Sequence, residues 1–259
     1  MPNTLSTLTP FPHIDSTVTT MAQREALQTI FQGLDFGVWL VGGTALAGYY
    51  ARHRVSYDLD LFAATKSHHQ ATVLAIKTLA DKGWGLANVV HTPHFFHVEV
   101  KAPGSSFTID AVLDSPLHTI GKAHTTEDGV TVASLDTLFA MKCACLISRC
   151  AEKDLYDLWW YLEKNPVSME EMIVHGAQFD GGVNCEALLI SVGGSTLRRE
   201  ACGFIVPGSG VTADNVFNTI SLLKKEFVIK LKKIYKSLPA SERASVLRES
   251  AKDMKQDNS

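Results

Sequence analysis

Three features that mark other protein classes are missing from the sequence. Its five cysteines form no CxxC pair, and an odd, scattered set argues against a disulfide framework or a zinc site. Uninterrupted apolar runs stay short of the ~18 residues that a membrane span needs. The opening residues, MPNTLSTLTPFPHIDSTV, lack the basic start and apolar stretch of a secretion leader. We therefore expect a cytoplasmic protein with reduced thiols and no membrane association.

An excess of charge of one sign is also missing. The formal net charge is −3 over 259 residues, which argues against a protein that is basic over its whole surface and coats nucleic acid. A local basic stretch is present, because residues 224–259 contain ten Lys or Arg and five acids. A lysine-rich helix face is either simply solvated or able to follow an RNA backbone, and the sequence leaves both readings open.

The chain as a whole has the composition of a folded protein. Hydrophobic residues make up 46% of it, enough for a sizeable core. Periodicity and turn residues predict an α+β fold. We expect a loose arm over 1–20, which is rich in Thr, Pro and Ser, a sheet-containing domain over 21–133, and a mainly helical domain over 134–259.

Individual elements are predicted by the spacing of apolar residues and by turn and capping residues. Strands are expected at 36–43, 56–64, 86–92, 95–102, 106–114 and 129–134. Helices are expected at 21–34, 44–54 and 69–83, from 135 to 163 with a break near 150–152, and at 217–238 and 240–254. Residues 165–215 show no clear pattern.

Two carboxylates alternate with leucines in the run DLDLF. Strand side chains alternate, so Asp58 and Asp60 project from one face, about 7 Å apart, while Leu59 and Leu61 point into the core. Neighbouring carboxylates repel each other and are costly to desolvate. A hard divalent cation such as Mg²⁺ is the usual compensation. An exposed strand face without a metal is the simpler alternative.

A glycine pair precedes this strand, with a short helix between them. Gly42 and Gly43 have no side chains, so a phosphate can approach their backbone, and Thr44 is expected to begin a helix whose free N–H groups point at it. A glycine pair alone also fits a bulge or a turn. The ordered combination of strand, glycine pair, helix and alternating aspartates favours a phosphate cradle beside a metal site.

The run GGTALAGYYARHRVSYDLDLF resembles the first motif of the DNA-polymerase-β-like nucleotidyltransferase superfamily. Its sequence specifically resembles the AbiE-type abortive-infection toxins, in which GGTALAL…R.S.DLDLF is typical. The resemblance implies a polymerase-β-like mixed sheet with flanking helices. It assigns Gly42, Gly43 and Thr44 to the nucleotide phosphates, and Asp58 and Asp60 to the metal.

A third carboxylate on a neighbouring strand is also implied by the resemblance. The run SFTIDAVLD supplies Asp110, which in the family completes the metal cluster and takes the proton of the attacking hydroxyl. Asp114 is the competitor, but it stands before Ser-Pro, where an aspartate more often forms a turn.

A second motif lies in MKCACLISRCAEKDLYDLWWYL, residues 141–162. Lys142 and Arg149 are seven apart and share a helix face. Lys153 and Asp157 are four apart, a spacing that also suits a plain surface ion pair. With Asp154, this set resembles the later motif of the same toxins, in which the lysine and the last aspartate are associated with nucleotide binding and activity.

The resemblance assigns roles to these residues as well. Lys142 offsets charge near the triphosphate, and Arg149 and Lys153 support nucleotide binding, because an arginine can clamp a phosphate. Asp157 either orients Lys142 or binds the sugar or base of the nucleotide. The predicted catalytic set is therefore Asp58, Asp60, Asp110, Lys142 and Asp157.

Together the motifs imply a Mg²⁺-dependent nucleotidyltransferase, with two metal ions at the acids, that moves a nucleoside monophosphate from an NTP to an acceptor hydroxyl. The resemblance points to a tRNA 3′ end as acceptor and to the toxin of a bacterial toxin–antitoxin pair, with a cognate antitoxin as partner. The alternatives are a small-molecule or protein acceptor, a catalytically inactive nucleotide-binding module, and an interaction protein whose acidic strand and basic helix are only surfaces.

Overall fold

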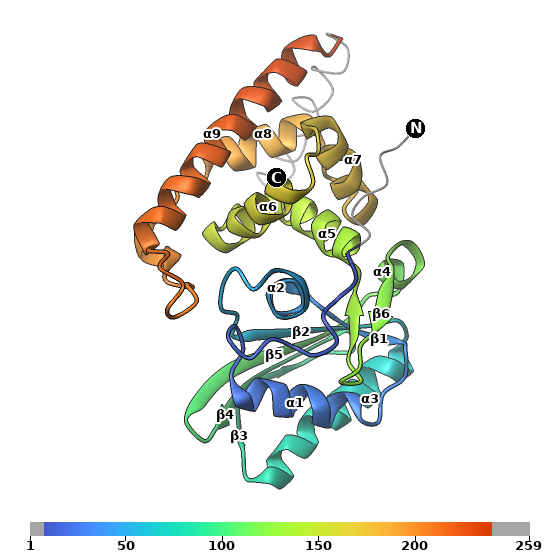
Figure 1. Ribbon diagram of the computed structural model, residues 1–259. Helices are drawn as coiled ribbons and strands as arrows, with labels where there is room; N and C mark the ends of the chain where they lie inside the picture. The colour runs from blue at the N-terminus through green and yellow to red at the C-terminus, as the bar shows by residue number, and fades with distance from the viewer. Residues whose placement is uncertain (1–7, 240–259) are drawn as a thin grey trace, which may run out of the picture.

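The computed structural model describes residues 8–239, and it places a sheet-containing part below a helical part (Figure 1). The seven-stranded sheet has the order β3-β4-β5-β2-β1-β7-β6. Because β2 pairs with β5 and β1 with β7 in parallel, while the other pairs are antiparallel, the sheet is mixed, as predicted. Its strands are β1 (Val38–Val41), β2 (Asp58–Ala63), β3 (Gly85–His91), β4 (Phe95–Ala102), β5 (Ser105–Leu113), β6 (Ala123–Thr125) and β7 (Thr131–Ala133).

Helices flank this sheet on both faces (Figure 1). Below it lie α1 (Met21–Phe31) and α3 (Lys66–Lys77), which continues in a 3₁₀ turn, Thr78–Lys82. Above it lies α2 (Gly42–Leu46), which continues in a π turn, Ala47–Ala51. The remaining helices are α4 (Ser115–Ile120), α5 (Leu135–Ser148), α6 (Glu152–Lys164), α7 (Met169–Phe179), α8 (Cys185–Gly194), a 3₁₀ turn (Arg199–Cys202) and α9 (Ala213–Ser237).

Strand β2 has the alternation that the sequence predicts. Leu59 and Leu61 are fully buried, whereas Asp58, Asp60 and Phe62 are partly exposed. The leucines anchor the strand in the core, and burial of each contributes about 1.5–3 kcal/mol. The opposite face of the strand is therefore held firmly toward the helical part.

Capping residues mark where several helices begin or end. Ser134 accepts a hydrogen bond from the Thr137 backbone N–H and begins α5. Gly83, at φ +78°, ends the 3₁₀ turn after α3 in the left-handed region. The predicted break between α5 and α6 is confirmed, because the helices end at Ser148 and begin at Glu152. Asp114 caps α4 by accepting from the Leu117 backbone N–H.

The prediction of a loose arm is wrong for residues 8–20. The backbone N–H of Phe11 donates to the Tyr49 carbonyl at 2.7 Å, and that of Asp15 to the Gly48 carbonyl at 2.9 Å. Val18 is buried. Ile14 is one physical reason, since its side chain lies against Gly48 in the turn that follows α2. The rest of the predicted arm, 1–7, lies outside the described residues.

The segment 165–215, which carried no clear pattern, contains α7 and α8. The last described helix, α9, starts at Ala213, earlier than predicted, because Thr212 and Asn215 form a capping box. The helix predicted at 240–254 lies outside the described residues. None of the helices within 8–239 is long and apolar enough to cross a membrane. The division at 133/134 falls between β7 and α5 and remains a proposal, because one apolar cluster runs through both parts.

Candidate active site

A cavity of about 320 Å³ lies between the exposed face of β2 and β5 and the helices α5 and α6. Acidic, basic and apolar side chains all line it. They are Val41, Gly42, Gly43, Arg54, Ser56, Asp58, Asp60, Phe62, Thr108, Asp110, Leu138, Met141, Lys142, Cys145, Arg149 and Lys153. Three of the predicted residues, Thr44, Asp154 and Asp157, are not among them.

The three predicted acids share this cavity. Asp58 and Asp60 project from one face of β2, and Asp110 stands opposite Asp60 in the parallel ladder with β5. Within the described residues, the Asp60 carboxylate has no hydrogen bond or ion pair. Burial, followed by the negative charges of Asp58 and Asp110, raises its pKa to about 6. Asp60 is therefore the acid of the three that no basic side chain contacts within the described residues.

The other two acids, Asp58 and Asp110, each have a partner. The Lys153 ammonium donates to Asp58 at 2.9 Å, and the Thr108 hydroxyl donates to the same carboxylate at 2.9 Å. Burial works to raise the pKa of Asp58, but Lys153 and Thr108 outweigh it and lower that pKa. Nδ1 of His97 lies 2.6 Å from an oxygen of Asp110.

This donor set fits a hard divalent cation in kind and in charge, because carboxylate oxygens are the ligands Mg²⁺ prefers and Asp60 lacks a counter-charge. The fit is incomplete in position. No group of three or more metal-binding side chains comes together closely enough to hold an ion within residues 8–239. Lys153 and Thr108 occupy the two oxygens of Asp58, whereas His97 occupies only one oxygen of Asp110, so a cation bound at Asp58 requires one of the Asp58 contacts to loosen.

The glycine pair makes room for the site's own side chains. A Cβ at Gly42, which has φ +70°, would collide with the Asp60 carboxylate, and one at Gly43 would collide with the Arg54 guanidinium. The prediction that Thr44 begins the helix is wrong, because α2 starts at Gly42. The Thr44 side chain is buried, and its hydroxyl donates to the backbone carbonyl of Asp58 at 2.5 Å.

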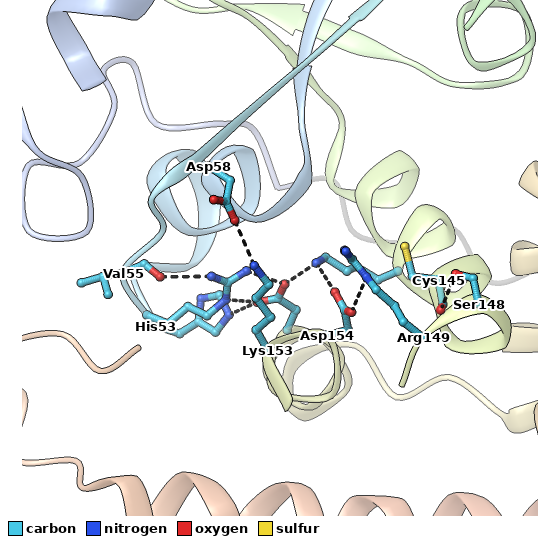
Figure 2. Close-up of polar contacts among 11 residues, drawn as sticks. His53, Val55, Asp58, Cys145, Ser148, Arg149, Lys153 and Asp154 are labelled. Carbon is cyan, nitrogen blue, oxygen red and sulfur yellow. Dashed lines mark hydrogen bonds and ion pairs between the residues drawn. The ribbon is translucent and has the colours of Figure 1, made fainter. Parts of the chain in front are cut away.

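A buried chain of charges joins the segment that follows the π turn to α5 and α6 (Figure 2). Arg54 donates from Nε and a terminal nitrogen to the two oxygens of Asp157, at 2.6 and 2.9 Å. His53 Nε2 lies 2.7 Å from the same carboxylate. The Lys142 ammonium lies 2.7 Å from Asp157 and 2.7 Å from Asp154.

Asp157 is consequently enclosed. Its side chain is fully buried, and although burial favours the neutral acid, Arg54 and Lys142 hold its pKa well below the usual range. Of the two roles that the sequence left open, only the orientation of Lys142 matches its contacts. The surface pair with Lys153 is not formed, because Lys153 reaches Asp58 instead.

Lys142 and Arg149 share Asp154, as their common helix face suggests. Arg149 Nε lies 3.1 Å from the Asp154 carboxylate, and its side chain is 58% exposed. Burial acts to lower the pKa of Lys142, but Asp157 and Asp154 outweigh it and raise that pKa. Lys142 therefore stays a cation at the cavity wall, with its ammonium fixed by two carboxylates.

Arg54, His53 and His97 contact acids of the site but were not predicted. Arg54 and His53 precede Ser56 inside the first motif, but their partner Asp157 lies more than a hundred positions further along the chain, so no local pattern reveals the pairing. His97 was set aside because it makes a poor metal pair with His94. Its position on β4, opposite Asp110 on β5, follows from strand register, which the sequence does not fix.

Solved structures resemble this chain in fold. The nucleotidyltransferase toxin MenT4 from Mycobacterium tuberculosis H37Rv matches with a TM-score of 0.56 and 16% identity, over 86% of this chain and 84% of that one. The Helicobacter pylori protein JHP933 matches with a TM-score of 0.48 and 18% identity, over 85% and 94%. No curated protein matches by sequence.

A family model gives the stronger relationship. The model of the nucleotidyl transferase AbiEii toxin, of the type IV toxin–antitoxin system, matches residues 26–201. That stretch contains every side chain that lines the cavity. The chain therefore belongs to the AbiEii nucleotidyl transferase toxin family.

Proposed function

We propose that this nucleotidyltransferase binds an NTP with Mg²⁺ in the cavity, transfers the nucleoside monophosphate to an acceptor hydroxyl and releases pyrophosphate. The observation that carries the proposal is the pairing of Asp60 with Asp110 across two parallel strands, with Asp58 on the same face. Three acids beside a glycine turn form the oxygen-rich site that this reaction requires.

Each acid has a role in the proposal. Asp58, Asp60 and Asp110 hold the divalent ions. When bound, such ions would stabilise the negative charge that develops on the phosphates during transfer. The oxygen of Asp110 that His97 does not contact accepts the proton of the acceptor hydroxyl.

The basic residues bind the triphosphate in this proposal. Lys142 is held by Asp154 and Asp157, which leaves one N–H of its ammonium for a phosphate oxygen. Arg149 has an exposed guanidinium that can clamp a phosphate in a bidentate way. Lys153, which contacts Asp58, would bind a phosphate when it is released from that carboxylate. Gly42 and Gly43 offer backbone N–H groups at the start of α2.

We further propose that the acceptor is the 3′ end of a tRNA and that the chain acts as a toxin opposed by a cognate antitoxin. The type IV toxin–antitoxin family supports the toxin role. Lysines on α9 support a polyanionic acceptor, because Lys225, Lys232, Lys233 and Lys236 are exposed. Phosphate contacts from such lysines are sequence-independent and sensitive to salt.

The test is incubation of the protein with total RNA and each α-labelled NTP in turn, with and without Mg²⁺. Label entering a tRNA-sized band, lost with EDTA and with Asp60→Asn, is the expected result. Label entering protein or a small molecule would replace the tRNA acceptor. Binding of NTP with no label transferred to any acceptor and no pyrophosphate released would identify an inactive nucleotide-binding module and overturn the proposal.

A further inference from the structure

We call the β2 and β5 side of the cavity its floor; along β2, the side chains of this floor change from charged to apolar. Asp58, Asp60 and Phe62 face the cavity at alternate positions, and each step along the strand is about 7 Å. Thr108 and Asp110 on β5 stand beside the first two. The floor is therefore charged at Asp58 and Asp60 and apolar at Phe62.

The opposite wall changes in the same way along α5. Leu138, Met141, Lys142 and Cys145 line the cavity from one face of α5, at spacings of three, four and seven residues, and Arg149 lines it directly after the helix ends. The first two are apolar, and Lys142 and Arg149 are cations. The wall therefore runs from apolar near the start of α5 to basic at its end.

The apolar end of β2, at Phe62, lies next to the apolar start of α5. Trp39 is the β1 partner of Phe62, and it lies beside Thr137, since a Cβ at Gly121 would be 3.1 Å from Trp39 and 3.0 Å from Thr137. The first turn of α5 therefore stands over the Phe62 end of the floor. At the other end, Lys153 contacts Asp58. The cavity is polarised along its whole length.

We propose that Phe62, Leu138 and Met141 form the nucleobase subsite of this cavity, with the triphosphate directed toward Gly42, Arg149 and Lys153. This rests on the proposed function, in which the cavity takes an NTP. A base presents an apolar π-face that stacks on an aromatic ring, and the Met141 thioether packs well against such a ring. The triphosphate needs the cations that only the other end supplies.

The reverse orientation is disfavoured by solvation. A base between Asp58 and Lys153 would remove charged groups from water without replacing their hydrogen bonds, and a triphosphate against Phe62 and Leu138 would find no donors. Both of these solvation costs apply to the reversed orientation of the nucleotide. The polarity of the cavity therefore fixes the direction of the nucleotide.

The experiment compares the dissociation constants of each NTP and of inorganic tripolyphosphate, in Mg²⁺, by calorimetric titration of the full chain. The variants are Phe62→Leu and Met141→Ala, both at partly exposed positions, and Met21→Ala is the control because Met21 is exposed on α1. We expect the two subsite variants to weaken the best-bound NTP by about five- to tenfold and to change tripolyphosphate binding by less than about twofold.

The outcomes separate this inference from the function beneath it. Wild-type protein that binds neither NTP nor tripolyphosphate would overturn the proposed function and the subsite together. Wild-type protein that binds an NTP no more tightly than tripolyphosphate, or variants that weaken both ligands equally, would overturn the subsite alone. The thermal midpoint of each variant, measured without ligand, reports whether it is folded, so a misfolded variant is recognised independently and the other subsite variant decides.

Discussion

Arg54 and Asp157 form a bidentate ion pair, with nitrogen–oxygen distances of 2.6 and 2.9 Å, in a place where neither side chain reaches solvent. Arg54 also stands against Gly43 and lines the cavity. Asp157, on α6, holds Lys142 on α5 as well. This one carboxylate therefore fixes the glycine turn and the cavity lysine relative to each other.

Asp157→Asn is expected to destabilise the protein by about 3 kcal/mol, because it leaves two buried cations short of a counter-charge. The free energy of unfolding from urea denaturation measures the effect. Glu226→Gln is the matched control, since Glu226 pairs with Lys230 at the surface of α9 and should cost less than about 1 kcal/mol. Equal losses in the two variants would show that the buried pair has no special role.

Thr44→Val tests whether Thr44 serves the fold or the nucleotide. Its hydroxyl donates to the Asp58 carbonyl in the core, so its loss should lower the free energy of unfolding by about 1–2 kcal/mol. Tripolyphosphate affinity should stay within about twofold. Thr29→Val, which removes a similar hydroxyl from α1, is the control. A tenfold loss of tripolyphosphate affinity without loss of stability would restore the role predicted from the sequence.

Gly42→Ala and Gly83→Ala separate backbone strain from crowding. Both glycines have positive φ, but a Cβ at Gly83 meets open space and one at Gly42 meets Asp60. Gly83→Ala should cost about 1–2 kcal/mol from the backbone alone, and Gly42→Ala clearly more, measured by urea denaturation. The variant Gly42→Ala with Asp60→Gly should cost less than the sum of the two single changes; strict additivity would contradict the contact.

The sequence predicted the parts of this fold that local patterns encode. Alternation in DLDLF placed Leu59 inside and Asp60 outside, and Ser134 marked the start of α5, because both depend on residues a few positions apart. The composition of residues 8–20 resembles that of a linker and led to the wrong prediction of a loose arm, because Val18 is buried in the core. Composition reports the average of a segment, and packing depends on single side chains.

The candidate site shows the same limit. Its acids could be listed from motifs, but their partners could not: Asp58 pairs with Lys153 on α6, and Asp110 with His97 on the neighbouring strand β4. The glycine pair was interpreted as open space for a phosphate, whereas Asp60 and Arg54 take the space where a Cβ of either glycine would lie, which leaves only the backbone N–H groups for that role. Such contacts depend on strand register and on the docking of α6, which no short-range pattern specifies.

Lys153→Met should tighten Mg²⁺ binding in the absence of nucleotide. The Lys153 ammonium neutralises Asp58 and occupies one of its oxygens, so it competes with a cation for that ligand. A Mg²⁺ titration of the thermal midpoint should saturate at lower concentration in the variant, by about three- to tenfold. Lys82→Met, at an exposed pair with Glu25, should leave the titration unchanged. Weaker binding in Lys153→Met would argue against competition.

Asp60→Asn should stabilise the metal-free protein at pH 8 and have little effect near pH 4. Burial and the neighbouring acids raise the Asp60 pKa from 3.8 to about 6, so between these values the folded state binds more protons than the unfolded state. Stability from this group is therefore lost as pH rises from about 4 to above 6. Asparagine does not titrate and removes that loss, because it cannot be repelled by Asp58 and Asp110.

Urea denaturation in EDTA at pH 4.5, 6 and 8 measures this effect as the difference between wild type and Asp60→Asn. The difference should grow with pH and level off above the raised pKa of Asp60. Asp157→Asn provides the opposite sign, because the lowered pKa of Asp157 makes its ionised form stabilising. Adding Mg²⁺ at pH 8 should raise the wild-type stability and leave Asp60→Asn nearly unchanged. A difference that stays constant from pH 4.5 to 8 would show that Asp60 is not under electrostatic strain and needs no cation to relieve it.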